Sequence, residues 1–193
     1  MPTLEIIGIP QSTYVRAVRM ACEEKGVPYT LVPEPPHSAA VTALHPFGKI
    51  PVMRNGDLEL CESKAIATYI DRTHPGPRLI PDDPKLAAEV EKWVSIVNTT
   101  IDPVIIREYA LAFILAKDGK PDAARVSAAV ANGYLVGDSF TFADINLMPI
   151  LFYLGRFPEG AALLEGTTNL KAYFARHAAR ESFKNTMPPM AKN

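Results

Sequence analysis

Hydrophobic residues at the start of the chain follow first the spacing of a strand, then that of a helix, then that of a strand again. Short apolar runs at residues 4–9 and 29–32 are typical of strands. The stretch between them predicts a helix over residues 13–25 that ends at Gly26, because apolar residues recur there at intervals of three and four: Val15, Val18 and Cys22. Two strands joined by a helix at this distance predict a right-handed βαβ unit.

A hairpin and a further helix are predicted next. Asn55-Gly56 lies between two short apolar runs, and both residues tolerate the positive φ angles of a type I′ turn. Pro51 opens the first of these strands, where a missing N–H costs least. Apolar residues return to helical spacing after Glu62, and a short helix is expected over residues 38–44. The resulting order, βαβ–α–ββα, is that of a thioredoxin-like domain.

The second half of the chain shows helical spacing throughout and no strand pattern. Asp83 is a favourable N-cap for a long helix, in which Pro103 predicts a kink or a break. Thr141 and Asp144 have the spacing of a helix cap ahead of another apolar segment. A last amphipathic helix is expected over residues 169–180.

Prolines cluster between the two patterns and indicate a linker between two domains. We expect a thioredoxin-like domain over residues 1–76, a linker over residues 77–85 and an all-helical domain over residues 86–193. The predicted fold class is therefore α/β followed by all-α.

Composition and charge argue against several kinds of partner. The 193 residues are 48% hydrophobic, enough for a substantial core, and their net charge of −1 gives no field for nucleic acid or an anionic membrane. No apolar run approaches the ~20 residues that span a bilayer, and the first residues lack the pattern of a signal peptide. Cys22 and Cys61 form no CxxC pair and are too few for a disulfide scaffold. We expect a cytoplasmic protein with no metal and no nucleic-acid or membrane partner.

Six motifs, in their order along the chain, resemble those of the cytosolic glutathione transferase family. Among its classes the resemblance is to the serine type, typified by phi and theta, with bacterial members. Each motif alone is a weak pattern, whereas six in the family's order are specific and cover essentially the whole chain. The motifs are Ser12-x-x-x-Arg16-Ala-Val, Glu23-Glu-Lys-Gly-Val-Pro-Tyr29, Pro46-Phe-Gly-Lys-Ile-Pro51, Leu60-x-Glu62-Ser63-x-Ala65-Ile66, Trp93 with Asp102-Pro103, and Gly137-Asp-Ser-x-Thr141-x-Ala-Asp144-Ile.

The resemblance implies a homodimeric enzyme that uses glutathione as its co-substrate and requires no metal. In this family the glutathione thiolate attacks a small hydrophobic electrophile. Two other functions stay open: a glutathione-dependent peroxidase, which uses the same thiolate, and a non-catalytic module that binds glutathione or another ligand.

The resemblance assigns the catalytic role to Ser12, whose hydroxyl would donate a hydrogen bond to the glutathione sulfur. A plain helix N-cap is the alternative, because serine is favoured at that position. Tyr14, with its acidic phenol, and Thr13 are weaker candidates. Thiol exchange of the glutaredoxin kind would need a cysteine at position 12, where serine stands.

By the same resemblance, two segments bind the γ-glutamyl and cysteinyl parts of glutathione. The backbone of Ile50 would pair with the cysteinyl part beside a cis bond at Pro51. Glu62 would bind the α-amino group, and Ser63 with the start of its helix would bind the carboxylate. The alternative is that Ser63 only caps the helix and Glu62 is exposed.

Lys49 and His37 would reach the glycine end of glutathione, although each is explained as well by an exposed loop position. His45 stands where the family often has asparagine, and we interpret it as structural.

The chain departs from the family in its second half. The family carries a long helix in the region that lies here between residues 121 and 134, so either this helix is truncated or a segment is absent. The departure affects the wall of the expected electrophile pocket, for which the candidates are Ile105, Tyr109 and Phe113 unless these are ordinary core residues.

Overall fold

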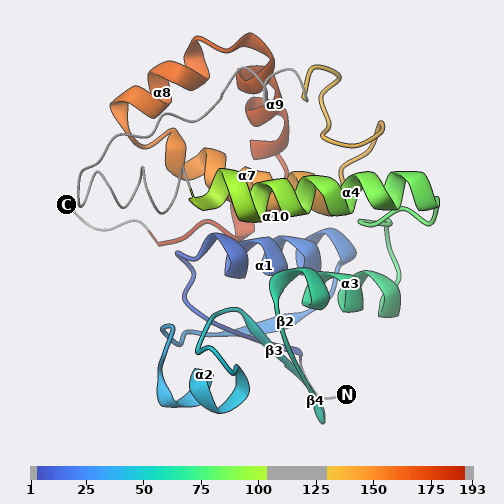
Figure 1. Cartoon of the computed structure of the whole chain (residues 1–193), viewed down its shortest axis with the longest axis vertical. Coiled ribbons are helices and arrows are strands. Elements are labelled where there is room, and N and C mark those ends of the chain that lie inside the picture. The colour runs from blue at the N-terminus through green and yellow to red at the C-terminus, as the bar shows by residue number, and fades with distance from the viewer. Residues whose placement is uncertain (1–3, 104–129, 190–193) are drawn as a thin grey trace. The chain divides into compact units, whose positions relative to one another are not determined.

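The structure, a computed structural model, describes residues 4–103 and 130–189, which belong to two compact units (Figure 1). One unit contains the chain up to Leu79 together with the segment that begins at Glu181, and the other is Ile80–Arg180. Among the described residues, no helix has the length and hydropathy required to cross a membrane.

The first unit is built on a four-stranded mixed sheet. The strand order is β2-β1-β3-β4, with β1 parallel to β2 and antiparallel to β3, and with β4 antiparallel to β3. The elements are β1 (Leu4–Ile7), α1 (Thr13–Lys25), β2 (Tyr29–Val32), α2 (Ala39–Leu44), β3 (Val52–Asn55), β4 (Leu58–Cys61) and α3 (Ser63–Thr73). This order confirms the predicted thioredoxin-like arrangement.

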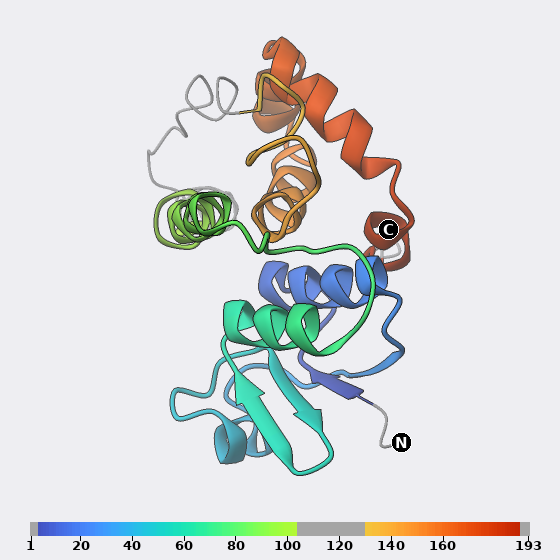
Figure 2. The same cartoon turned by 90° about the vertical axis from the view of Figure 1, so that its right-hand side faces the viewer.

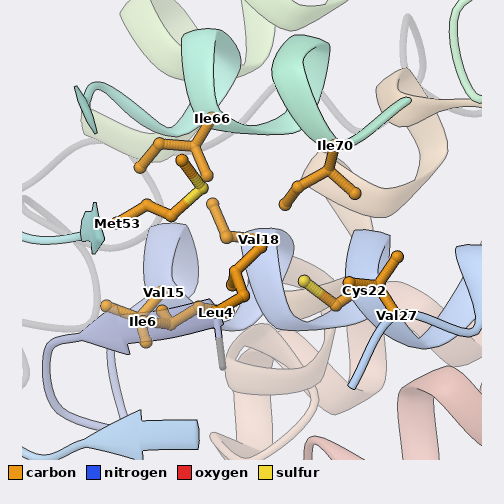
Figure 3. Close-up of a cluster of buried hydrophobic side chains, with 9 residues drawn as sticks. All are labelled: Leu4, Ile6, Val15, Val18, Cys22, Val27, Met53, Ile66 and Ile70. Carbon is orange, nitrogen blue, oxygen red and sulfur yellow. The ribbon is translucent and has the colours of Figure 1, made fainter. Parts of the chain in front are cut away.

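Helices α1 and α3 cover one face of the sheet and α2 lies on the other, as Figures 1 and 2 show. Successive residues of β1 therefore point into different cores. Ile6 packs toward α1 and α3, whereas Ile7 packs with Val41 of α2. The larger core is drawn in Figure 3 and contains the predicted apolar side of α1, with these members: Leu4, Ile6, Val15, Val18, Cys22, Val27, Met53, Ile66 and Ile70.

The hairpin is present, but its turn lies one residue later than predicted. Asn55 pairs with Leu58, so the two-residue loop is Gly56-Asp57. Gly56 has a φ of 64°, whereas Asn55 is not among the residues with positive φ, which excludes the expected type I′ turn at Asn55-Gly56. The side-chain amide of Asn55 donates a hydrogen bond to the hydroxyl of Tyr69 on α3 at 3.1 Å, a contact that holds it within the strand.

The segment that begins at Glu181, which was expected within a helical domain over residues 86–193, groups with the first unit. Helix α10 (Glu181–Asn185) packs against α1. The buried Arg16 donates to the carbonyl of Phe183 at 3.1 Å, and its guanidinium carbon lies 4.1 Å from the centre of the Phe183 ring. Arg19 donates to two further carbonyls of this segment, at 3.2 and 3.3 Å. A buried guanidinium needs such partners, and the C-terminal segment supplies them.

The described part of the second unit contains helices and no strand, as predicted. These helices are α4 (Pro84–Ile96), η1 (Val97–Ile101), α7 (Phe142–Leu154), α8 (Pro158–Glu165) and α9 (Thr168–Ala178). Both expected caps are present. Asp83 accepts hydrogen bonds from two N–H groups of the first turn of α4, at 2.9 and 3.0 Å. Thr141 and Asp144 form a capping box at the start of α7.

The helix ahead of Pro103 contains a π-helical segment. The residues Val97–Ile101 form a π-helical segment, and helical geometry continues to Pro103. A proline ring clashes with the carbonyl four residues earlier, and a π segment widens the helix at that point. The kink or break predicted at Pro103 would involve the residues after it, which lie outside the described residues.

Candidate active site

Three segments leave the sheet of the first unit at the same edge. The register pairs Ile7, the last residue of β1, with Val52 at the start of β3, and it pairs Val52 with Cys61 at the end of β4. The three segments that adjoin these positions, after β1, before β3 and after β4, therefore start side by side. They contain most of the candidate residues: Ser12, Ile50, Pro51, Glu62 and Ser63.

Gly8 permits a close approach between the first helix and the loop before β3. A Cβ atom at this position would lie 2.5 Å from Cγ2 of Val15 and 3.1 Å from Cβ of Ile50. Because the first distance is far inside van der Waals contact, no larger residue fits there without a shift. The glycine thus brings Ile50 against the first turn of α1, directly after Ser12.

Ser12 is the N-cap of α1, and its geometry suits both proposed roles. Its half-buried side chain accepts a hydrogen bond from the N–H of Val15 at 3.4 Å. A hydroxyl can accept and donate at the same time, so the Ser12 O–H is able to donate to a ligand while the cap is kept. Tyr14 lies inside the first turn of α1.

The loop before β3 has the expected backbone. The Ile50–Pro51 peptide bond is cis, as the family resemblance predicted. Pro51 is buried and Ile50 half-buried, while Lys49 is exposed. His37 is also exposed. Its backbone N–H donates to the carbonyl of Gly48 at 2.8 Å, and this hydrogen bond places His37 beside the loop.

The start of α3 has no side-chain cap. Glu62 is the N-cap residue but makes no capping hydrogen bond, and Ser63 is already the first helical residue. The interpretation of Ser63 as a plain cap is therefore wrong. Glu62 has a φ of 70°, which is rare for a residue with a side chain. The uncapped N–H groups of the first turn form a ready site for a carboxylate.

His45 contacts the site, which its sequence position did not indicate. The side chain is only 3% exposed, and its Nε2 lies 3.6 Å from Oε1 of Glu62. Its Nδ1 accepts a hydrogen bond from the N–H of Phe47 at 3.0 Å. No local spacing in the sequence links His45 to Glu62, so only the folded chain reveals the contact.

We assign neither cysteine to the site, and the described residues offer no metal centre. Burial, the largest cause, raises the pKa of the Cys22 thiol to about 12, so this thiol stays protonated. Cys61 is half-buried and has no disulfide partner. The described residues contain no group of three or more side chains arranged to hold a metal ion. The expected pocket residues Ile105, Tyr109 and Phe113 lie outside the described residues.

Comparison with known sequences identifies both halves of the chain. Residues 6–78 match the family described as "Glutathione S-transferase, N-terminal domain", and residues 123–181 match "Glutathione S-transferase, C-terminal domain". A probable glutathione S-transferase GSTF1 from Oryza sativa is 30% identical over 99% of this chain and 98% of its own. Glutathione S-transferase F13 of Arabidopsis thaliana is 28% identical over 96% and 95%. The rice alignment spans 223 positions against 193 residues here, so the rice protein has residues without a counterpart in this chain.

Solved structures share the fold along the whole chain. Glutathione transferase F7 of Populus trichocarpa is 26% identical, with a TM-score of 0.78 over 95% of this chain and 97% of its own. A glutathione S-transferase of Methylobacterium radiotolerans, solved in complex with glutathione sulfonate, is 27% identical, with a TM-score of 0.80 over 99% and 97%. With both domain descriptions matched and the relatives aligned nearly end to end, this chain belongs to the glutathione S-transferase family.

Proposed function

We propose that the protein is a serine-type glutathione transferase that binds glutathione at the sheet edge of the first unit and activates its thiol toward small hydrophobic electrophiles. One observation carries the proposal: the Ser12 hydroxyl, the cis Ile50–Pro51 bond and the uncapped start of α3 lie at the same edge. The names of the full-length relatives and the glutathione sulfonate bound by the Methylobacterium protein support it.

The residues at this edge fit the two ends of glutathione. The N–H groups at the start of α3, which no N-cap side chain bonds, suit the γ-glutamyl carboxylate together with the Ser63 hydroxyl, and the Glu62 carboxylate suits the α-amino group beside it. The backbone of Ile50 suits the cysteinyl part in the manner of an added strand. Lys49 and His37, both exposed on the neighbouring loops, suit the glycine carboxylate.

Ser12 would stabilise the thiolate. A thiol with a pKa near ~8.5 is a few per cent ionised at neutral pH, and lowering the pKa by about 2 requires about 2.7 kcal/mol. A hydrogen bond to a charged group supplies ~1.5–3 kcal/mol and a helix N-terminus ~0.3–1 kcal/mol. Ser12 combines both, because it donates from the N-cap of α1. The thiol of glutathione gives its proton to solvent, and the thiolate sulfur then forms the new bond to carbon; in an aryl halide the carbon–halogen bond breaks and halide leaves.

Three assignments complete the proposal. We assign electrophile binding to Ile105, Tyr109 and Phe113 of the second unit. We also expect a cytoplasmic protein that forms a homodimer, and within each chain a domain boundary within residues 77–85.

Two alternative functions are a peroxidase that uses the same thiolate and a binding module without catalysis. Assays with a hydroperoxide and with an aryl halide would recognise them. Turnover of the aryl halide is the result that supports the proposal.

The test replaces Ser12 with alanine and titrates the bound glutathione thiol by its thiolate absorbance. Loss of one donor to the sulfur should raise the pKa of the bound thiol by about 1–2 and lower kcat, while glutathione still binds. Loss of the cap should also lower the free energy of unfolding by about 0.5–2 kcal/mol.

Ser38→Ala is the matched control. Ser38 caps α2 in the same way, accepting from the N–H of Val41 at 3.2 Å, and has no proposed contact with the sulfur. It should lose stability as Ser12→Ala does and leave the thiol titration unchanged. If Ser12→Ala also leaves the titration unchanged, Ser12 is only a cap and the serine-type mechanism is wrong.

A further inference from the structure

His45 is a buried histidine whose two ring nitrogens face different parts of the site. His45 is the C-cap of α2, and its backbone N–H donates to the carbonyl of Val41 at 2.8 Å. This hydrogen bond fixes the backbone position from which the ring extends. Its Nδ1 accepts from the N–H of Phe47 at 3.0 Å, so Nδ1 carries no hydrogen. In the neutral ring the hydrogen therefore lies on Nε2, the atom 3.6 Å from Oε1 of Glu62.

The Glu62 side chain needs such a restraint. Its side chain is 72% exposed, and a glutamate in water samples many rotamers that a ligand would have to restrict. Its backbone is already held at a positive φ, which fixes the direction in which the side chain leaves the chain. His45, whose side chain is only 3% exposed, offers a fixed N–H dipole to the carboxylate from the protein side.

We propose that His45 is a positioning residue for glutathione binding: its Nε2–H restrains the Glu62 carboxylate in the place where it meets the ligand's ammonium group. This inference rests on the proposed function, because it takes Glu62 as the residue that binds the γ-glutamyl amino group. It replaces our interpretation of His45 as a merely structural loop residue. At 3.6 Å the contact is longer than a hydrogen bond, so the restraint is electrostatic and closes further when the ligand ammonium fixes the carboxylate.

Two substitutions separate the two sides of the ring. In His45→Asn the amide oxygen stands in for Nδ1 and still accepts from Phe47, but nothing replaces Nε2. In His45→Gln the longer amide places a donor near Nε2, but the acceptor for Phe47 is lost. A structural role predicts that glutamine is the more harmful change, whereas a positioning role predicts that asparagine weakens glutathione binding.

The experiment measures the Kd of reduced glutathione by calorimetry, together with the thermal midpoint of each variant. We expect His45→Asn to raise the Kd about three- to tenfold, in the lower range of couplings between contacting side chains, with little change in midpoint. His45→Gln should lower the midpoint and raise the Kd less. An unchanged Kd in His45→Asn would overturn the inference.

Glu62→Gln distinguishes failure of this inference from failure of the proposed site. If Glu62→Gln leaves the Kd unchanged, the proposed role of Glu62 is wrong and His45 has nothing to position. If Glu62→Gln weakens binding but His45→Asn does not, only the role of His45 is wrong. The double variant should bind about as weakly as Glu62→Gln alone, since the two side chains act as one unit.

A measurement on the folded wild type and on Glu62→Gln makes the test independent of whether the His45 variants fold. Ring nitrogen NMR should show His45 protonated at Nε2 and not at Nδ1, and the Nε2 resonance should move in Glu62→Gln. Protonation at Nδ1 in the neutral ring would contradict the proposal. An Nε2 resonance that has the same chemical shift in the wild type and in Glu62→Gln would also contradict it.

Discussion

At the scale of single residues, the backbone of Glu62 indicates a site selected for function over stability. Its φ of 70° and ψ of 116° lie outside the regions that residues with side chains favour. Such a conformation costs about 1–3 kcal/mol and persists only where the surroundings enforce it. Here Glu62 lies between the end of β4 and the start of α3, and its carboxylate makes no capping hydrogen bond to its own helix.

Glu62→Gly and Glu62→Ala separate the strain from the carboxylate. Both remove the carboxylate and should weaken glutathione binding to a similar extent. Glycine also relieves the strain, so Glu62→Gly should be more stable than Glu62→Ala by about 0.5–2 kcal/mol after its own backbone entropy is counted. Urea unfolding of the pair measures this difference. Equal stability of the two variants would show that the positive φ costs no more than the backbone entropy of glycine, about 0.5–1 kcal/mol.

At the scale of elements, His177 of α9 links that helix to the segment that precedes α7. Nε2 of His177, near the end of α9, donates to the carbonyl of Gly133 at 2.8 Å, and its buried Nδ1 has no hydrogen-bond partner among the described residues. Burial lowers the pKa of His177. The hydrogen bond to the carbonyl of Gly133 opposes this shift of the pKa, as Asp144 does less strongly, while Arg180 and Arg176 add weakly to it.

The second unit should therefore lose stability in mild acid. Below a pH of about 6.5 the unfolded chain takes up a proton on this histidine, whereas the folded chain resists it. The free energy of unfolding should fall with pH, by at most ~1.4 kcal/mol per pH unit from this group. Urea unfolding between neutral pH and pH ~5 measures the slope.

His177→Gln is the comparison that isolates this group. A glutamine amide can still donate to the carbonyl of Gly133 but does not titrate. The stability difference between wild type and His177→Gln should shrink as the pH falls, because all other groups cancel. A difference that is constant with pH would assign the acid sensitivity elsewhere.

The elements were predictable where local rules decide them, and the contacts between distant elements were not. Helix α1 follows from its apolar spacing and ends at Gly26 with a φ of 63°, both readable in the sequence. The hairpin turn was misplaced because the side chain of Asn55 bonds Tyr69 on another element. The Arg16–Phe183 contact joins residues 167 positions apart, and no local pattern indicates it.

The same division holds for the candidate site. Motifs predicted that Ser12, Pro51 and Glu62 belong together, and the register explains why they share an edge. The contact of His45 with Glu62 was missed because it depends on how the end of α2 meets the start of α3 in space.

At the scale of the whole molecule, Phe47 is the clearest candidate for a contact between copies of the chain. It is 71% exposed, the highest value among the large hydrophobic residues of the described part. Burial of one such side chain contributes about 1.5–3 kcal/mol, and a two-fold dimer would bury it twice. This exposure supports the proposed homodimer.

Phe47→Ser should weaken the dimer strongly. Loss of two buried rings raises the dissociation constant by roughly a hundredfold or more, since each 1.4 kcal/mol is tenfold. Sedimentation over a range of concentrations measures this change, with Phe47→Leu as a control that keeps most of the apolar surface. A wild-type chain that stays monomeric, or a serine variant that dimerises as tightly, would contradict it.

The hydrogen bonds from Arg16 and Arg19 to the segment that begins at Glu181 have a consequence for biosynthesis. The ribosome completes α1 well before it makes the carbonyls that receive its two guanidinium groups, because those carbonyls lie 166 and 167 positions later in the sequence. Domains commonly fold in order as they emerge, whereas here the nascent first unit lacks part of its own structure until the second has been synthesised. A premature stop codon in the second unit would therefore leave both units incomplete, although the first would have been translated in full up to Leu79.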